Sequence, residues 1–436
     1  MKYDRALRFL DNHINLEAKA GRWEGLSLER IRQAMAAIGD PQTAYPVVHV
    51  TGTNGKGSTV LLITELLKAH GLRVGTYMSP HVERINERIR IDGDPIADDE
   101  FGEAIGEIAR LEPLLRETTP GDPLSHFEIL TAAALNWFAL APVDVAVVEV
   151  GLLGRWDATN VVDARVAVVT NVGRDHTDGT GDWRRAIAQE KAGIIKPDST
   201  LVLGETAPDL RPIFLEEPHA AQLERDVDFE CMANNLAVGG RVVDVRTSRR
   251  EYDDVFIALH GAHQGDNAAI AIAAVEAFFD APLNDELVRE AFAAVQVPGR
   301  FEVMRRNPLV VIDAAHNPDG ARVALRSLDE GFGEGRPRIL VVGLLQGRDP
   351  GEMLDALGGD RAELVIACEP NWPRAIPASD LGDAARAKGI AVEVVPDVED
   401  ALHRAIALAT EDDTIFVTGS FYVIGPARRA LAAMED

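Results

Sequence analysis

The chain has 436 residues, a length that predicts two domains and leaves room for a third. With 46% hydrophobic and 26% charged residues, its composition is that of a folded globular protein and excludes fibrous, low-complexity and disordered classes. The formal net charge of −26 opposes general binding to nucleic acid or anionic lipid, so an anionic substrate would need a locally positive pocket.

Nothing in the sequence indicates secretion or membrane insertion. The longest apolar stretch, residues 129–153, is interrupted by charged, amide and proline side chains, so it cannot cross a bilayer as one helix. The first residues lack the charged, apolar and cleavage regions of a signal peptide. Cys231 and Cys368 are the only cysteines and neither belongs to a CxxC pair, which argues against a disulfide framework or a cysteine zinc site. We therefore expect a cytoplasmic protein with no membrane partner.

The first half of the chain alternates short apolar runs with helical patterns. Residues 46–51 form a β-branched apolar run, a glycine-rich turn follows, and residues 58–70 have helical periodicity. A helix is predicted at residues 183–195, and further strands at residues 74–78, 143–150 and 165–171. Strands made almost entirely of Val and Ile between helices predict an α/β fold with a doubly wound, mostly parallel sheet.

The second half contains one unclear segment and then the same alternation again. Residues 201–259 carry several charges and no clean periodicity, which leaves open a β-meander or an excursion between strands. After residue 298, strands are predicted at residues 310–313, 339–343, 364–367, 391–395 and 414–418. We therefore expect one domain over residues 1–298 and a smaller Rossmann-like α/β domain over residues 299–436.

The turn after the first strand has the residues of a phosphate-binding loop. It reads Gly52-Thr-Asn-Gly-Lys-Gly-Ser-Thr59 and precedes a helix. Glycines allow backbone N–H groups to face an anion, the helix N-terminus adds partial positive charge, and Lys56 can reach outer phosphates. Ser58 or Thr59 could ligate Mg²⁺. The spacing departs from the standard Walker A pattern because Gly57 separates Lys56 from Ser58, and a glycine-rich turn without a ligand is the alternative.

This loop resembles the phosphate loop of the Mur ligase superfamily, in the form carried by folylpolyglutamate synthases and dihydrofolate synthases. Further motifs similar to those of this family follow in order from His49 to about Gly425. The resemblance implies a P-loop-type central Mur ligase domain followed by a C-terminal glutamate ligase domain. It also implies that ATP is bound by Gly52, Thr53, Asn54, Gly55, Lys56, Gly57, Ser58 and Thr59.

The resemblance further implies two magnesium sites. Their ligands would be Ser58, Ser79, Glu149, His176 and a carbamylated Lys191. Taken singly, these residues have ordinary explanations: Ser79-Pro80 is a common turn, a glutamate at a strand end is often solvated, and Glu190-Lys191 suits an exposed helix face. A lysine near metal ions loses its proton more easily and can then add CO₂, so the carbamate is chemically reasonable.

Two segments resemble those that contact the pterin or folate substrate in the family. Residues Ser125, His126, Phe127 and Glu128 open a helix. The same residues form a capping box, with Ser125 at the N-cap and Glu128 three residues on, and both interpretations can hold together. Asp157, in the loop after Glu149, is similar to the aspartate that organises the folate or pteroate site.

The remaining motifs involve both predicted domains. Asn267 resembles the asparagine that contacts adenine, although an asparagine near a helix start is usually a cap. Arg300 follows the predicted hinge and resembles an arginine that reaches ATP phosphates, a contact that suits its guanidinium. Asp313 would contact the nucleotide. His316 and Ser420 resemble residues on the glutamate side of the site.

Together these motifs predict an ATP- and Mg²⁺-dependent ligase that adds L-glutamate to dihydropteroate, to (tetrahydro)folyl-(poly)glutamate, or to both. The resemblance implies an acyl phosphate intermediate and release of ADP and phosphate, with Lys56, Lys191 and His316 as catalytic residues. Positive groups and two Mg²⁺ ions would offset the repulsion between a carboxylate and a triphosphate. The partners would be small molecules, and we expect a monomer. Whether a monovalent cation takes part is left open.

Two other functions stay open at this point. Another Mur-type amino-acid ligase, acting on cell-wall precursors, would share the loop, the metals and the domain order, and only the segments at residues 125–128 and at Asp157 favour a pterin. A catalytically inactive nucleotide-binding regulatory protein is the alternative from another class. The presence of Lys56, Glu149, His176 and Lys191 argues against it.

Overall fold

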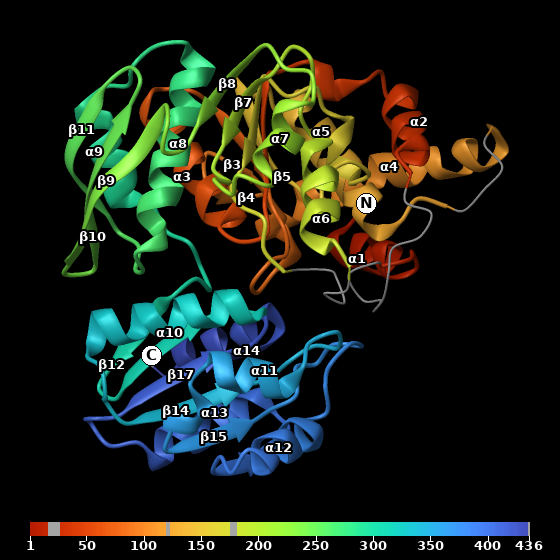
Figure 1. Cartoon of the computed structure of the whole chain (residues 1–436). Helices are drawn as coiled ribbons and strands as arrows, with labels where there is room; N and C mark the ends of the chain where they lie inside the picture. The colour runs from red at the N-terminus through yellow and green to blue at the C-terminus, as the bar shows by residue number, and fades with distance from the viewer. Residues whose placement is uncertain (16–26, 119–122, 175–180, 435–436) are drawn as a thin grey trace.

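The structure is a computed structural model that describes residues 1–15, 27–118, 123–174 and 181–434. Two α/β units lie one above the other, the first containing the N-terminus and the second the C-terminus (Figure 1). The first unit has an eight-stranded and a three-stranded sheet, and the second has a six-stranded sheet.

The eight-stranded sheet is mostly parallel, which confirms the predicted doubly wound fold. Its strand order is β4-β3-β2-β5-β1-β6-β7-β8, and all neighbours from β2 to β8 pair in parallel. The parallel strands are β1 (Val47–Thr51), β2 (Val74–Tyr77), β5 (Val145–Glu149), β6 (Val166–Val169), β7 (Thr200–Leu203) and β8 (Ala221–Glu224). An antiparallel edge is formed by β3 (Ile89–Ile91) and β4 (Asp94–Pro95). Strands β1, β5 and β6 are buried throughout because helices cover both faces.

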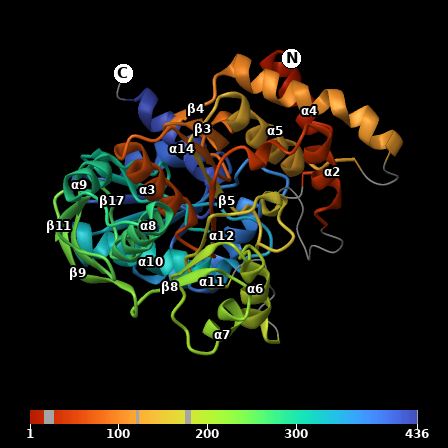
Figure 2. The ribbon, with the colours of Figure 1, turned by 90° about the horizontal axis from the view of Figure 1, so that it is seen from above.

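Helices α3 and α8 cover one face of this sheet, and α1, α2, α4 and α5 cover the other, while α6 and α7 pack near β6 and β7. Seen from above, α2, α4 and α5 lie on the opposite side of the molecule from α8 and α9 (Figure 2). The helices are α1 (Tyr3–Asp11), α2 (Glu29–Ala37), α3 (Lys56–Ala69), α4 (Asp98–Thr118), α5 (His126–Leu140), α6 (Trp183–Ala192), α7 (Arg211–Leu215), α8 (His263–Phe279) and α9 (Asp285–Ala294).

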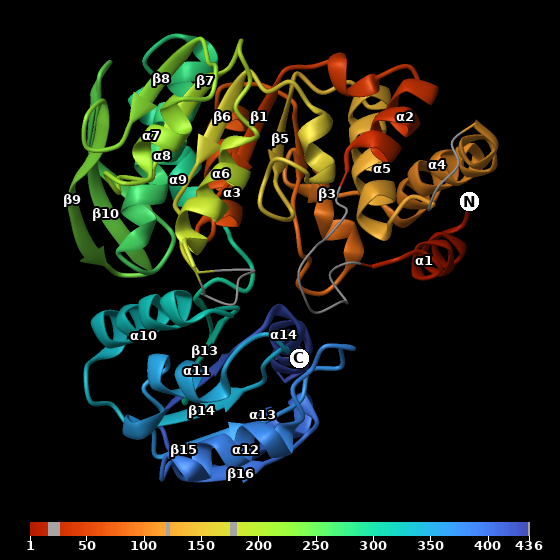
Figure 3. The same cartoon turned by 45° about the vertical axis from the view of Figure 1, so that its right-hand side comes forward.

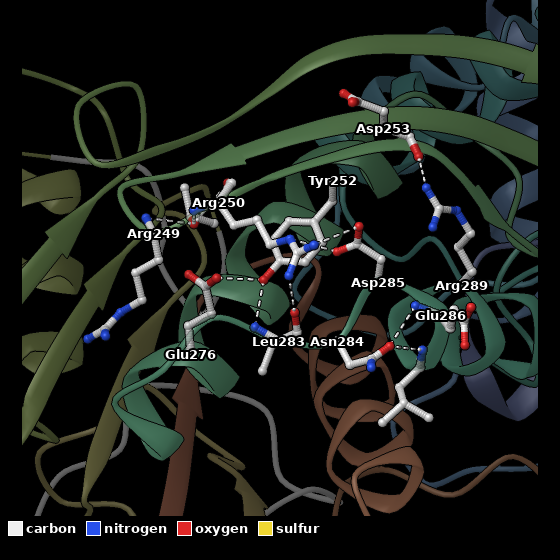
Figure 4. A network of polar contacts seen from close by, with 12 residues as sticks. Arg249, Arg250, Tyr252, Asp253, Glu276, Leu283, Asn284, Asp285, Glu286 and Arg289 are labelled. Carbon is white, nitrogen blue, oxygen red and sulfur yellow. Dashed lines mark hydrogen bonds and ion pairs between the residues drawn. The ribbon is translucent and has the colours of Figure 1, made fainter.

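The segment that the sequence left open ends in a β-meander. After β7, α7 and β8, the antiparallel strands are β9 (Phe229–Ala237), β10 (Gly240–Thr247) and β11 (Glu251–Ile257). A buried network ties this sheet to α8 (Figure 4). The Tyr252 hydroxyl donates to Glu276 Oε1 at 2.6 Å and accepts from the Leu283 N–H at 2.8 Å. Burial raises the pKa of Glu276. The hydrogen bond from Tyr252 offsets the cost of burying this carboxyl and so helps to hold the meander against α8.

The second unit repeats the α/β pattern on a smaller scale. Its sheet has the order β12-β13-β17-β14-β15-β16, parallel except for the antiparallel edge strand β12. The strands are β12 (Glu302–Arg306), β13 (Leu309–Asp313), β14 (Arg338–Val342), β15 (Leu364–Ala367), β16 (Val392–Val394) and β17 (Thr414–Thr418). The five strands predicted after residue 298 correspond to β13 to β17. Only β12 was not predicted.

Helices cover both faces of this second sheet as well. Helices α10, α11 and α12 pack on one face, and α13 and α14 on the other. Their bounds are α10 (Pro318–Phe332), α11 (Pro350–Ala356), α12 (Ala378–Ala387), α13 (Val398–Leu408) and α14 (Phe421–Ala433). Helix α10 runs along the side of the second unit that faces the first (Figures 1 and 3). Within the described ranges, no helix is both long enough and apolar enough to span a membrane.

Candidate active site

The phosphate loop joins the end of β1 to the start of α3, and the end of β6 holds it in place. The Asn54 carbonyl accepts from Thr170 Oγ1 at 2.7 Å and from Asn171 Nδ2 at 3.0 Å, and the Asn54 N–H donates to Asn171 Oδ1 at 3.0 Å. Gly55 has a φ of 82°, which favours glycine. A Cβ at Gly52 would lie 1.8 Å from Thr170 Oγ1, so the loop path requires glycine there too.

Lys56, the cation of the loop, opens α3 and turns back over the loop. Its Nζ donates to the Gly52 carbonyl at 2.9 Å and to the Thr53 carbonyl at 3.3 Å. The lysine charge therefore lies beside the backbone that would surround a phosphate.

A cavity of about 230 Å³ lies where the two units meet. Five Lys or Arg side chains and three carboxylates line it, so the site is locally positive although the whole chain carries −26. Thirteen of the predicted site residues line this one cavity: Thr53, Gly55, Lys56, Gly57, Ser79, Ser125, Phe127, Glu128, Glu149, Asp157, Arg300, His316 and Ser420.

Glu149 reaches the cavity because it ends β5, the strand beside β1. The carboxyl ends of parallel strands meet at one edge of a sheet, where ligands bind in such folds. The side chain is 4% exposed, and Oε2 accepts from the Ser79 N–H at 3.1 Å. Burial raises the pKa of the Glu149 carboxyl, whereas the charges of Lys56 and Arg300 lower it. A desolvated carboxylate is thus placed beside the phosphate loop.

The oxygen donors near the loop suit Mg²⁺, which prefers carboxylate and hydroxyl oxygens. Glu149 and Ser79 lie together, and Ser58 and Thr59 open α3. Thr59 Oγ1 is buried and has no hydrogen-bond partner within the described part of the chain. The desolvated Glu149 carboxylate and Ser79, which both line the cavity, are compatible with a divalent cation at this position.

The second predicted metal site is only partly described. His176 lies outside the described residues. Lys191, on α6, is 3% exposed and is not among the residues that line the cavity. Its backbone packs against the loop after β5, because a Cβ at Gly154 would lie 3.0 Å from Lys191 Cα. Over the described ranges, no cluster of three or more His, Cys, Asp or Glu residues has the arrangement of a metal site.

Helices α2 and α5 build one wall of the cavity. The predicted capping box is present: the Ser125 N–H donates to Glu128 Oε2 at 2.7 Å, and the Glu128 N–H donates to Ser125 Oγ at 3.2 Å. Arg30 Nε lies 3.2 Å from each Glu128 carboxylate oxygen. Phe127 packs so closely on the opposite loop that a Cβ at Gly151 would lie 2.4 Å from its ring. This wall combines an aromatic ring with an ion pair.

Asp157 organises the loop that follows Glu149. Its Oδ2 accepts from the Leu152 N–H at 2.7 Å, and its Oδ1 accepts from the Thr159 N–H at 2.9 Å and from the Thr159 hydroxyl. Burial raises the pKa of the Asp157 carboxyl, and the hydrogen bonds from Thr159 lower it. Trp156, which this loop holds over the cavity, is 46% exposed.

The second unit contributes the facing wall. The Arg300 guanidinium lies 4.6 Å from the centre of the Phe421 ring. His316 Nδ1 lies 2.9 Å from the Ala314 carbonyl, a contact that requires the proton on Nδ1. Ser420 caps α14 by accepting from the Tyr422 N–H at 3.0 Å.

Some predicted nucleotide residues lie behind the cavity wall. Asp313 accepts from the Phe301 and Ala315 N–H groups, each at 2.8 Å, so its carboxylate holds the hinge backbone. Burial raises the pKa of this carboxyl and Arg300 lowers it. Asn267 reaches the loop from α8, because a Cβ at Gly55 would lie 2.6 Å from Asn267 Oδ1. The remaining predicted residues that do not line the cavity are Gly52, Asn54, Ser58, Thr59 and His126.

Several cavity residues were missed by sequence reasoning. Arg348 Nε donates to the His316 carbonyl at 2.7 Å, and Arg374 Nη2 donates to the Gln346 carbonyl at 2.9 Å. Arg374, like Arg30, reaches the site from an element that carries no motif, whereas Arg348 lies in the segment Gln346-Gly-Arg-Asp349 of the sequence. Among the 37 arginines of the chain, no local signal separates Arg30 and Arg374 from surface residues.

The fold and the cavity together define a ligase of the Mur type: a P-loop α/β unit whose phosphate loop faces a second α/β unit across one positive cavity. Two family descriptions agree, since the Mur ligase middle domain matches residues 126–275 and the Mur ligase glutamate ligase domain matches residues 299–421.

Within that class, the chain belongs to the dihydrofolate synthase/folylpolyglutamate synthase family. It is 39% identical to the dihydrofolate synthase/folylpolyglutamate synthase of Mycobacterium tuberculosis, over 92% of this chain and 89% of that protein. The structure of the M. tuberculosis folylpolyglutamate synthase with ADP and AMPPCP is 37% identical, with a TM-score of 0.91 and 98% of both chains covered. A bifunctional enzyme solved with Mn, AMPPNP and L-glutamate is 30% identical, with a TM-score of 0.84, covering 100% of this chain and 98% of that one.

Proposed function

We propose that this chain joins L-glutamate to dihydropteroate, to a (tetrahydro)folyl-(poly)glutamate, or to both, with conversion of ATP to ADP and phosphate. The observation that carries the proposal is the cavity between the units, where the phosphate loop, Glu149, the wall at Phe127 and the wall at Ser420 face one another. A similar enzyme holds a metal, a nucleotide analogue and L-glutamate together, as a ligation of this kind requires.

The first chemical step transfers a phosphoryl group. A carboxylate oxygen of the pteroyl or folyl substrate attacks the γ-phosphorus of ATP, the bond to the bridging oxygen breaks, and ADP leaves. Both reactants are anionic, so Lys56 and the loop N–H groups hold the phosphates while Arg300 approaches from the second unit. Mg²⁺, when bound through Ser58 or Thr59, Ser79 and Glu149, supplies further charge neutralisation.

The second step forms the amide. The amine of glutamate attacks the carbonyl carbon of the acyl phosphate, the carbon–oxygen bond to phosphate breaks, and the ammonium proton is lost to a base. His316 and Ser420 are on the wall of the second unit and bind glutamate in this proposal. The Nδ1–H of His316 is turned to the Ala314 carbonyl, which fixes the orientation of the ring, and this imidazole accepts the proton in our proposal. Because the cavity lies between the two units, the protein limits the access of water to the acyl phosphate.

The other roles in the proposal follow the family resemblance. Ser125, His126, Phe127, Glu128 and Asp157 form the pterin or folate side, whereas Asn267 and Asp313 shape the nucleotide side from behind the wall. His176 and a carbamylated Lys191 would hold a second Mg²⁺, which would neutralise further charge and give Lys191 its catalytic role in this proposal. We further propose that the protein is a cytoplasmic monomer whose partners are small molecules. Its domains are proposed to span residues 1–298 and 299–436.

An ADP-release assay tests this function and separates it from its rivals. Enzyme, ATP, Mg²⁺ and glutamate are mixed with dihydropteroate, with tetrahydrofolate, or with a muramyl nucleotide. We expect ADP only with the pterin substrates. ADP with the muramyl nucleotide alone would indicate a cell-wall ligase, and no ADP with any acceptor would indicate a regulatory protein.

Two substitutions test the site itself. Lys56→Ala and Glu149→Ala should abolish pterin-dependent ADP release while leaving the unfolding temperature near that of the parent. Lys68→Ala, on the same helix as Lys56 but paired with Glu65 away from the cavity, is the matched control and should retain turnover. Near-normal turnover of either site variant would refute the role given to that residue.

A further inference from the structure

One partly buried contact between the units lies outside the chemistry proposed above. Asn317 is the N-cap of α10, since its Oδ1 accepts from the Gly320 N–H at 2.7 Å. The Nδ2 of the same side chain donates to Oδ1 of Asn54, in the phosphate loop, at 3.1 Å. Asn317 is 2% exposed. A single amide therefore caps a helix of the second unit and holds a loop residue of the first.

The other side of Asn54 is already fixed within the first unit. Its backbone N–H and carbonyl are engaged by Thr170 and Asn171 at the end of β6. The side chain is the part of this residue that reaches the second unit. The phosphate loop is therefore held from two directions, by its own sheet and by the N-terminus of α10, which faces the first unit in Figure 3.

The ion pairs between the units engage other residues than this contact does: Arg174 with Glu352, Arg241 with Glu330, and Arg428 with Glu83. Arg174 and Glu352 are paired at 3.1 Å with side chains 42% and 37% exposed. Arg241 and Glu330 are paired at 3.3 Å, with side chains 7% and 48% exposed. Of these, the pair of Arg174 and Glu352 is exposed on both sides, so it contributes little and is screened by salt. The ion pairs favour docking of the units in general, whereas the Asn54–Asn317 bond acts on the phosphate loop itself.

We infer that Asn317 is a positioning residue for the ligase reaction: by holding Asn54, it aligns the phosphate loop with the reacting groups of the second unit. This inference rests on the proposed function. Nucleotide binding depends on groups of the loop, such as Lys56, that are present without the second unit. Phosphoryl transfer also requires Arg300 and the substrates to be correctly positioned relative to that loop. Loss of the bond therefore affects turnover more than nucleotide affinity.

The test variant is Asn317→Ser. Serine is a good N-cap, so α10 keeps its cap, but the shorter side chain cannot reach Asn54. Loss of one hydrogen bond that is made in the reacting state predicts a fall in kcat of about three- to tenfold. The KM for ATP and the Kd for ADP, measured by calorimetry, should change by less than about twofold. Asn284→Ser changes the N-cap of α9 (Figure 4), a residue that does not line the cavity; it controls for the cap exchange and should retain kcat.

Two further variants make the assignment specific. Asn54→Ser combined with Asn317→Ser should cost no more than the worse single change, because both remove the same bond. Glu352→Gln removes an exposed pair of the seam and should leave kcat within about twofold at physiological salt.

An unchanged kcat in Asn317→Ser, with the parent enzyme active, would overturn the inference. So would fully additive effects of the two asparagine changes, a loss of ADP affinity as large as the loss of kcat, or an equal effect of Glu352→Gln. An unfolding temperature of Asn317→Ser well below that of the Asn284→Ser control would assign Asn317 a merely structural role. Failure of the parent enzyme to release ADP would instead refute the proposed function.

Discussion

His49 is an imidazole that the fold holds in its neutral form. It lies on β1 and is 0% exposed. Its Nε2 is 2.9 Å from Thr159 Oγ1, and that hydroxyl donates its own proton to Asp157. The hydroxyl must therefore accept from His49, so Nε2 carries the proton. His49 Nδ1 is buried and has no hydrogen-bond partner among the described residues, so a second proton there would be unsatisfied.

The pH dependence of stability follows from this arrangement. Burial, helped by the charge of Lys196, lowers the pKa of His49 from 6.5 to about 3. Between these values the unfolded chain binds a proton at this residue and the folded chain does not, so acidification destabilises the fold. At 1.36 kcal/mol per unit, the fall from pH 7 to 4.5 removes about 2–3 kcal/mol through this residue alone.

The perturbation is His49→Gln, which keeps a donor for Thr159 and removes the titration. The variant should be less stable than the parent at pH 7, because glutamine does not fill the space of the ring. As the pH falls to 4.5, the difference in the free energy of unfolding between parent and variant should shrink by about 2–3 kcal/mol. Only the parent loses stability by keeping a neutral imidazole in the fold while the unfolded chain binds a proton. Urea unfolding followed by tryptophan fluorescence, at half-unit steps of pH, measures the difference.

The control is His403→Gln, which removes an exposed imidazole from α13. Parallel stability curves for the parent and His49→Gln between pH 7 and 4.5 would refute the reasoning. They would mean that the imidazole either is protonated in the folded state or is not buried as the contact with Thr159 requires.

Two further predictions concern the cavity. Gly52→Ala should abolish ADP binding in calorimetry because its Cβ would lie 1.8 Å from Thr170 Oγ1, and Thr170→Ala in the same chain should restore it only in part, since the residue 170 Cβ remains at 3.0 Å. Gly331→Ala, with nothing within 4 Å, is the matched control, and normal ADP binding by Gly52→Ala would contradict the packing argument. Arg30→Met should raise the KM for the pteroyl or folyl substrate severalfold, because it unpairs Glu128 in that wall, while the KM for ATP stays within about twofold. Equal rises in both constants would show that Arg30 supports the fold rather than the substrate wall.

Much of the fold was determined by local sequence. Strands such as β15 and β17 were predicted within their observed bounds, because buried parallel strands are continuous runs of β-branched residues. The phosphate loop was equally clear, since its glycines are required by the backbone path at Gly52 and Gly55. The capping box at residues 125–128 was also predicted, because its two hydrogen bonds join residues three positions apart.

The tertiary structure decided which side chains meet. Asp313 belongs to a recognisable motif, yet its carboxylate holds the hinge backbone instead of lining the cavity. Arg30 carries no motif and lies against Glu128, and Asn317 meets Asn54 across 263 positions of sequence. Periodicity and motifs report the conformation of a few neighbouring residues. Contacts across the seam depend instead on how two separately covered sheets pack against each other, a relation that no single segment encodes.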